Sequence, residues 1–189
     1  MKVFYFLFFI FPINGHSQSK LDTSWLVGID KFRLVVNTNN NSINEVNSKV
    51  ILYKNKKMLL TDSLLCSFLK FQFDDINKDS KKDFLIYKNT GARTNLTYYL
   101  FLYIEANKSY KRVVGYDEWP NVGRTKIKNI LVSEIRSGTY EYKFFKLLDS
   151  GKLINLDVSQ VDNELDGNGY EKGLKRARKL LQKKTEAQQ

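Results

Sequence analysis

Apolar and polar residues alternate with a period of two through most of this chain. Phe32, Leu34 and Val36 share one face of a run whose other face holds Lys31 and Arg33. This alternation predicts half-buried β-strands, because successive side chains of a strand point to opposite faces of its sheet. Clusters of Asn, Gly and Lys separate the runs at spacings typical of all-β domains. We therefore expect one mainly β domain with antiparallel strands.

The pattern predicts about nine or ten short strands. They cover residues 32–36, 50–53, 58–60, 69–73, 84–87, 96–104, 110–114, 127–135, 139–147 and 153–158. The run 96–104 differs from the others because it is apolar at consecutive positions. We expect it to be a central strand that is covered on both faces.

The pattern changes after Val161. Residues 162–169 are rich in Asp, Asn and Gly, which predicts a flexible connection, and Tyr170 to Glu186 predict a helix. Its apolar stripe is narrow and comprises Leu174, Ala177, Leu180 and Leu181. Its remaining surface is basic and comprises Lys175, Arg176, Arg178, Lys179, Lys183 and Lys184. We expect this tail, residues 162–189, to dock lightly on the β-domain or to fray. A membrane surface is an alternative target of its charge.

The first 17 residues predict a cleaved secretory signal. A short positive region precedes an apolar run over residues 3–13, which is shorter than the about 20 residues of a membrane-spanning helix. Gly15 and Ser17 suit a small-residue cleavage rule, with cleavage after Ser17 or after Ser19. We therefore expect a periplasmic or secreted protein whose β-domain covers residues 18–161.

Removal of this signal limits the available chemistry. The sequence has one histidine, His16, and one cysteine, Cys66. Without histidine, histidine general bases and histidine-ligated zinc are excluded, and one thiol cannot form an intramolecular disulfide. Cys66 lies in an apolar run, so we expect a small buried residue. Asp117 and Glu118 are adjacent in sequence, so their carboxylates would point apart on a strand rather than face each other across a cleft. An enzyme built on carboxylates is therefore the weakest of the functional hypotheses. We expect a protein that is not an enzyme.

The most specific chemical signal lies between two strand-like runs, in residues 75–83. Asp75, Asn77, Asp79 and Asp83 occupy loop positions one, three, five and nine. Calcium is a hard cation that takes six to eight oxygen ligands, and alternate positions of a tight loop bring such oxygens around one centre. We predict that these four side chains and the main-chain carbonyl of Lys81 bind calcium. The alternative is a polar turn that binds no ion.

The loop starts like an EF-hand but departs from it, and its position six and the nearby charge bear on affinity. An EF-hand has a bidentate glutamate at position twelve, where this chain has Ile86. Position six is Ser80 rather than glycine, which costs about 1 kcal/mol if that residue has positive φ. Nearby lysines add unfavourable charge. We expect a modest affinity, in the range of about 0.1 to 1 mM, and a structural role for the ion.

This nine-residue loop between two strands resembles the calcium loop of FG-GAP or integrin-type β-propeller repeats, whose usual form is Asp-x-Asn-x-Asp-Gly-x-x-Asp. The loop is followed by the aromatic strand Tyr98 to Tyr103, a hairpin into residues 110–114, an aromatic-proline loop and two closing hairpins. Over residues 25–158 this order resembles a family of small bacterial periplasmic proteins. The resemblance implies an antiparallel, propeller-like or sandwich-like single domain. Some members are immunity proteins that inhibit peptidoglycan-degrading effector enzymes.

An inhibitor needs a contact surface with rigid aromatic anchors. The loop 116–121 is the first candidate, because its tryptophan and tyrosine offer contact area and Pro120 stiffens the chain. The turn 137–140 is similar to the Ser-Gly-x-x-Tyr element of periplasmic lysozyme inhibitors, with the tyrosine one residue early. The partner-binding residues predicted are Tyr116, Asp117, Glu118, Trp119, Asn121 and Tyr140. The alternatives are that Trp119 plugs one end of the core and that Ser137 and Gly138 form only a hairpin turn.

The formal net charge of +11 favours an acidic partner. An exported protein rarely meets DNA, and strand alternation accounts for the aromatic residues between lysines, so nucleic acid is not expected. The leading hypothesis is a non-catalytic inhibitor or immunity protein that binds an exported hydrolase or toxin. The alternative is a calcium-dependent envelope module that binds glycan or a surface protein.

Overall fold

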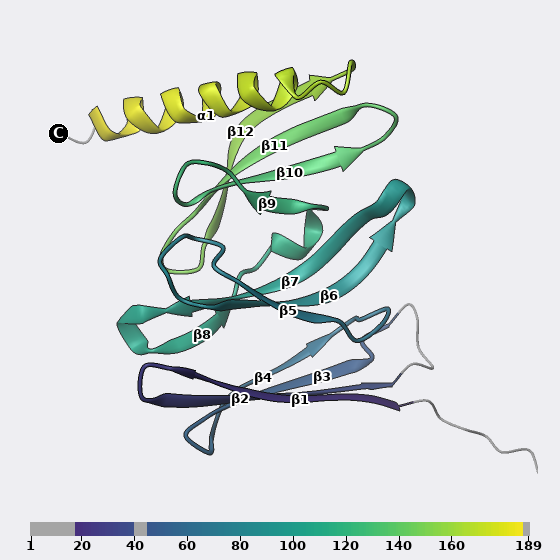
Figure 1. Ribbon diagram of the computed structural model, residues 1–189, viewed down its shortest axis with the longest axis vertical. Coiled ribbons are helices and arrows are strands. Elements are labelled where there is room, and N and C mark those ends of the chain that lie inside the picture. Colours follow the sequence, from purple (N-terminus) through teal and green to yellow (C-terminus); the bar gives the residue numbers. More distant parts are fainter. Residues whose placement is uncertain (1–17, 40–44, 187–189) are drawn as a thin grey trace, which may run out of the picture.

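The computed structural model describes residues 18–39 and 45–186. The predicted signal segment, residues 1–17, lies outside the described residues. The described chain forms three four-stranded antiparallel sheets and a C-terminal helix (Figure 1). The mainly β class, the antiparallel pairing and the terminal helix are therefore confirmed.

In each sheet, the strands follow one another in chain order. Sheet 1 contains β1 (Gln18–Val27), β2 (Asp30–Asn39), β3 (Ser48–Lys54) and β4 (Lys57–Leu64). Sheet 2 contains β5 (Phe71–Asp74), β6 (Asp83–Gly91), β7 (Asn95–Ile104) and β8 (Ser109–Arg112). Sheet 3 contains β9 (Val122–Arg124), β10 (Ile130–Arg136), β11 (Tyr140–Leu147) and β12 (Leu153–Asp162), and the helix is α1 (Asn168–Glu186). Three short 3-10 helices, η1 (Ala92–Thr94), η2 (Glu105–Asn107) and η3 (Tyr116–Glu118), lie in the connections.

The number of strands differs from the sequence prediction. The described residues contain twelve strands rather than nine or ten, and the two that the pattern did not reveal are β1 and β9. In β1, Thr23 lies opposite Leu34 on the side of the strand that faces the core. Because threonine is polar, the sequence of β1 does not show a continuous apolar side. β9 has only three residues, one of which is Gly123, so no periodicity is visible in it.

The sheets stack face to face, and α1 lies on sheet 3 as a fourth layer (Figure 1). One core cluster lies between sheets 1 and 2, a second between sheets 2 and 3, and a third between sheet 3 and α1. Large side chains of the first cluster are Phe32, Leu34, Leu52, Phe84, Phe101 and Tyr110. Those of the second are Leu100, Leu102, Tyr116, Phe145 and Leu147, and those of the third are Tyr142, Phe144, Val158 and Leu174.

Strand β7 contributes to both sides of sheet 2. Tyr99 and Phe101 pack toward sheet 1, whereas Leu100 and Leu102 pack toward sheet 3. None of the four is more than 4% exposed. This confirms the prediction of a central strand covered on two sides. Burial of such side chains contributes roughly 1.5 to 3 kcal/mol each, so this strand is a main source of stability.

The helix docks more closely than its narrow apolar stripe predicts. Leu174 and Ala177 are fully buried, while Leu180 is 39% exposed. A Cβ atom added at Gly173 would lie 2.3 Å from the ring of Phe144, so the absence of a side chain there brings helix and sheet together. No helix of the described residues is long and apolar enough to cross a membrane.

The close approach at Gly173 makes a test of helix docking. Phe144 is fully buried and has no free space for its ring, so Gly173→Ala should overpack the interface. Although alanine favours helix formation, we expect a net loss of about 1 kcal/mol or more in the free energy of unfolding. Urea denaturation measures this loss. Lys175→Ala, at an exposed position of the same helix, should change it by less than about 0.5 kcal/mol.

Candidate functional site

The predicted calcium loop connects β5 to β6, and its backbone is folded by its own side chains. The carboxylate of Asp75 accepts hydrogen bonds from the amides of Asp79 and Ser80, both at 3.0 Å. The Asn77 Oδ1 accepts from the Asp79 amide at 3.3 Å, and the Asp79 Oδ1 accepts from the Lys81 amide at 2.8 Å. The side chains at loop positions one, three and five therefore turn toward the inside of the loop.

The loop contains two residues in the left-handed region of backbone conformation. Ser80, at position six, has φ of 67°, and Lys78 has φ of 59°. Glycine takes this conformation without the steric cost that a Cβ atom brings, which is about 1 kcal/mol for a residue such as serine. Ser80 thus has the conformation that the glycine of the resembled loop favours, and this chain carries the strain.

Asp83, at position nine, is a buried hub. Its side chain is fully buried, its Oδ2 accepts from the Ile76 amide at 2.9 Å, and its Oδ1 accepts from the Tyr103 amide at 2.9 Å. These bonds connect the start of the loop to β7. Burial raises the pKa of Asp83 to about 7, the charges of Asp79 and Asp75 also raise it, and the two amide bonds oppose the rise.

No lysine or arginine neutralises the carboxylates inside the loop. Among the ion pairs of the described residues, none includes Asp75, Asp79 or Asp83. The lysines of the loop are directed elsewhere. Lys78 donates to the carbonyl of Thr125 at 2.8 Å, and Lys81 lies 3.6 Å from Glu105. No ion pair with a described lysine or arginine therefore offsets the negative charge of the loop.

The chemical types of the candidate ligand atoms are those that calcium prefers. Three carboxylates, an amide oxygen and a main-chain carbonyl are the hard oxygen ligands that this ion prefers. Within the described residues, no three His, Cys, Asp or Glu side chains converge closely enough to hold a metal ion as they stand. Calcium ligation at about 2.3 to 2.6 Å thus requires side chains of the loop to move toward one another.

The C-terminal end of the loop is anchored by residues of sheet 1 and sheet 2. The Tyr110 hydroxyl donates to the carbonyl of Lys82 at 2.8 Å and accepts from Trp25 Nε1 at 2.8 Å. The Trp25 ring packs against Phe73 at 4.9 Å and Phe84 at 5.7 Å between centroids. An aromatic cluster from sheets 1 and 2 therefore holds the loop in place.

The loop 116–121 lies between sheets 2 and 3, and two of its predicted partner residues are buried. Tyr116 is 1% exposed and belongs to the core, where its hydroxyl donates to the Val122 carbonyl at 3.3 Å. Asp117 is 9% exposed and pairs with Lys88 at 2.8 Å and Arg112 at 3.5 Å. Both side chains have partners within the fold.

The other residues of this loop are only partly available. Trp119 is half-buried and packs on Phe145 at 5.1 Å between ring centroids, so it plugs the space between sheets 2 and 3. The Asn121 Oδ1 accepts from the Leu96 amide at 3.0 Å, and its Nδ2 donates to the Glu134 carbonyl at 2.9 Å. Glu118 is exposed.

Tyr140 is separated from the loop 116–121 by sheet 3. It packs with the cluster beneath α1, whereas Trp119 packs with the cluster on the opposite face. The arginine Arg136 lies 5.9 Å from the Tyr140 ring. The six predicted partner residues therefore do not gather on one surface, because alternate positions of β11 face opposite layers.

A different surface, which the sequence did not indicate, is open to solvent. No described element covers the outer face of sheet 1. Cross-strand pairing places Arg33, Tyr53 and Met58 in one row on this face, and Val35 and Ile51 in the next. A hollow of about 360 Å³ is lined by Lys31, Arg33, Tyr53 and Lys56. We call this surface the sheet 1 outer face.

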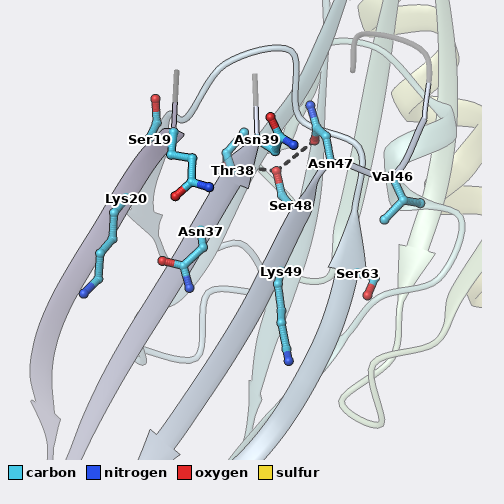
Figure 2. Close-up of a pocket in the computed structure, with 11 residues that line it drawn as sticks. Ser19, Lys20, Asn37, Thr38, Asn39, Val46, Asn47, Ser48, Lys49 and Ser63 are labelled. Atoms are coloured by element: carbon cyan, nitrogen blue, oxygen red, sulfur yellow. Dashed lines mark hydrogen bonds between the residues drawn. The ribbon is translucent and has the colours of Figure 1, made fainter. Parts of the chain in front are cut away.

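At one end of sheet 1, a second hollow of about 550 Å³ is lined by polar side chains from the strand ends (Figure 2). The Thr38 and Ser48 hydroxyls lie 2.9 Å apart, and the Ser48 hydroxyl donates to Asn47 Oδ1 at 2.9 Å. Asn47 in turn donates to the carbonyl of Cys66, which is fully buried as predicted. Figure 2 shows Lys20 and Lys49 on strands beside this network.

Comparison with family models, curated proteins and solved structures gives no match. The resemblance to calcium-loop proteins therefore rests on the residues of the loop and on their order along the chain.

The buried carboxylate of Asp83 predicts a pH dependence of stability. Its pKa is about 7 in the folded protein against an ordinary value of 3.8. The folded state therefore binds more protons than the unfolded state between about pH 4 and 7, and stability falls as the pH rises through this range. In EDTA, we expect Asp83 to contribute a slope of at most about 1.4 kcal/mol per pH unit to the free energy of unfolding.

Urea denaturation of the wild type and of Asp83→Asn at several pH values measures this slope. The asparagine does not titrate, so the variant should be less dependent on pH over the same range. Parallel curves for the two proteins would contradict the prediction.

Proposed function

We propose that this protein acts by binding, as an exported inhibitor or immunity protein against a cell-wall-degrading enzyme, and that calcium in the loop 75–83 stabilises it. The observation that carries the proposal is the loop itself. Asp75, Asn77 and Asp79 fold its backbone with their side-chain oxygens, and Ser80 has the left-handed conformation of the expected glycine. These features support the resemblance to the calcium-loop family, some of whose members inhibit such enzymes.

Asp75, Asn77, Asp79 and Asp83 would hold the ion together with the carbonyl of Lys81. A bound calcium ion supplies positive charge to carboxylates that have no ion-pair partner. It would favour the ionised form of Asp83, which burial and the neighbouring acidic residues disfavour in its absence. Because Asp83 also contacts β7, the ion would stabilise the connection between the loop and sheet 2.

The arrangement of the sheets also supports this assignment. Each sheet is a four-stranded antiparallel meander in chain order, and consecutive sheets stack face to face. Propeller blades are four-stranded sheets of the same kind. We propose that the fold is propeller-like, with three blade-like sheets and α1 covering the last one.

The calcium site is tested by thermal or urea unfolding of Asp79→Asn. With calcium at ten to a hundred times the dissociation constant, the wild type should gain about 1.4 to 2.7 kcal/mol in the free energy of unfolding. The variant should lose most of this gain and should be at least as stable as the wild type in EDTA, because it has less acidic repulsion. Glu118→Gln removes one exposed acidic charge outside the loop and should keep the gain.

Equal stability of the wild type in calcium and in EDTA would contradict the site. The loop would then be a polar turn that its own hydrogen bonds maintain.

The sheet 1 outer face is better suited than the loop 116–121 to contact the proposed enzyme partner. Its centre is apolar, with the partly exposed Ile51 and the exposed Met58, and Tyr53 provides a rigid aromatic anchor. Around this centre, exposed cations include Lys20, Lys31, Arg33, Lys49 and Lys56, and Arg33 pairs with Asp22 of the same face at 2.6 Å. Two copies of this chain would oppose like charges across such an interface. The surface is complementary to an acidic protein, which its field would also attract.

Inhibition assays test this assignment. The native partner is first isolated from the periplasm and identified as a wall hydrolase, and the purified enzyme is then titrated with variants. Tyr53→Ala should weaken inhibition by at least about 10-fold, as expected for an aromatic anchor. Tyr140→Ala is the matched control on sheet 3 and should inhibit like the wild type. Equal loss in both variants, or no inhibition by the wild type, would contradict the proposal.

A second candidate function is favoured by the hollow in Figure 2. Asn37 and Ser63 present an amide and a hydroxyl, which are the groups that bind sugar hydroxyls. A calcium-dependent envelope module that binds glycan would use this hollow. Recovery of glycan rather than a hydrolase, with binding weakened by Asn37→Ala, would favour this second function.

A further inference from the structure

Helix α1 lies at the end of the stack opposite sheet 1 (Figure 1), and its exposed side carries basic residues. Lys172, Lys175 and Lys179 are exposed and follow one another at spacings of three and four residues. Residues at these spacings lie on one side of a helix, and at 1.5 Å per residue the row is about 10 Å long. Leu174 and Ala177 are buried against sheet 3, so the row points away from the protein.

Two arginines extend this surface to both sides of the lysine row. Arg178 lines a hollow between α1 and the β9–β10 connection, and Arg176 lines another above β12. Together with Lys172, Lys175 and Lys179 they form five exposed cations, which we call the helix cap.

The charge of the helix cap is not compensated. None of its five side chains forms an ion pair with a described residue. Glu171 is the only acidic residue between Asn168 and Gln182, and it pairs with Lys126 at 2.8 Å. The five side chains therefore carry five positive charges. A second carboxylate, Asp157, lines a hollow together with Arg176 and Lys179 and forms no ion pair with a described residue.

The hollows on either side of the helix combine cations with apolar side chains. The first, of about 860 Å³, contains Ile127 and Leu174 beside its basic residues. The second, of about 420 Å³, contains Leu156, Val158 and Leu180, together with the carboxylate of Asp157. A ligand that fits both has negative charge next to hydrocarbon, as acidic phospholipids do.

We propose that the helix cap binds the surface of an anionic phospholipid membrane. The five cations lie on the exposed side of α1, and no large aromatic side chain lies among them, so the surface lacks the rigid aromatic anchors that many protein interfaces use. Lysines and arginines near an anionic leaflet are each attracted to it, and the attraction is screened by salt.

The helix lies on the membrane through its polar face, because its apolar face is packed on sheet 3. In this orientation the sheet 1 outer face points away from the membrane.

Vesicle binding tests the proposal with the full chain. The probes are vesicles of phosphatidylglycerol mixed with phosphatidylcholine, and vesicles of phosphatidylcholine alone. Binding to the second set measures any contribution of the apolar residues 3–13 and is subtracted. We expect binding that requires phosphatidylglycerol and falls at high salt. The triple variant K172Q/K175Q/K179Q should reduce this partitioning by about 100-fold.

The matched control is K57Q/K70Q/K108Q, which removes the same charge from exposed lysines of sheets 1 and 2 and their connections, outside the sheet 1 outer face. It should bind vesicles like the wild type. Thermal unfolding verifies that both variants fold, because all six lysines are exposed and form no ion pair with a described residue.

Several outcomes would overturn the proposal. Equal loss in the two triple variants would show an effect of net charge alone. Wild-type binding to poly-glutamate but not to phosphatidylglycerol vesicles would assign the helix cap to acidic proteins. These outcomes are independent of calcium and of enzyme inhibition, so they do not bear on the function proposed above.

Discussion

The structure depends on a sheet that is apolar on both faces. In β7, Tyr99 and Phe101 require a cover on one side, and Leu100 and Leu102 require one on the other. One sheet cannot bury both of its own faces, so the chain stacks sheet 1 and sheet 3 against the middle sheet. Sheet 3 is apolar on its far side as well, and α1 supplies the fourth layer. Sheet 1 ends the stack with a face that no described element covers.

The loop 75–83 is held within this stack by a polar interaction. Asp83 is a fully buried carboxylate that accepts amides from the loop and from β7, so the loop cannot move independently of the middle sheet. The same burial raises the pKa of the carboxyl and makes the ionised form costly. The proposed calcium ion would offset this cost and the charge of the two further acidic residues of the loop. The loop is thus joined to the middle sheet by its own hydrogen bonds.

The exposed surface has two basic regions with different chemistry. The sheet 1 outer face combines cations with Tyr53 and an apolar centre, which suits the defined shape of an acidic protein. The helix cap consists of separate flexible cations on a ridge, which suits the diffuse charge of a membrane. The two regions lie at opposite ends of the stack, where no further described layer covers them. The loop 116–121 lies between layers, and its aromatic residues fill the core.

The sequence by itself determined the mainly β class, the central strand, the buried Cys66, the terminal helix and the spacing of the candidate ligands. These features follow from local periodicity, because the spacing of apolar residues indicates both the backbone conformation and which face of a strand or helix is buried. Only the tertiary structure decided that Tyr116 and Asp117 are buried, that Trp119 and Tyr140 lie on opposite faces of sheet 3, and that β1 and β9 complete their sheets. Periodicity predicts that a face is covered, but the covering element comes from distant parts of the chain. The close contact of Gly173 with Phe144 has the same origin, since it exists only once helix and sheet meet.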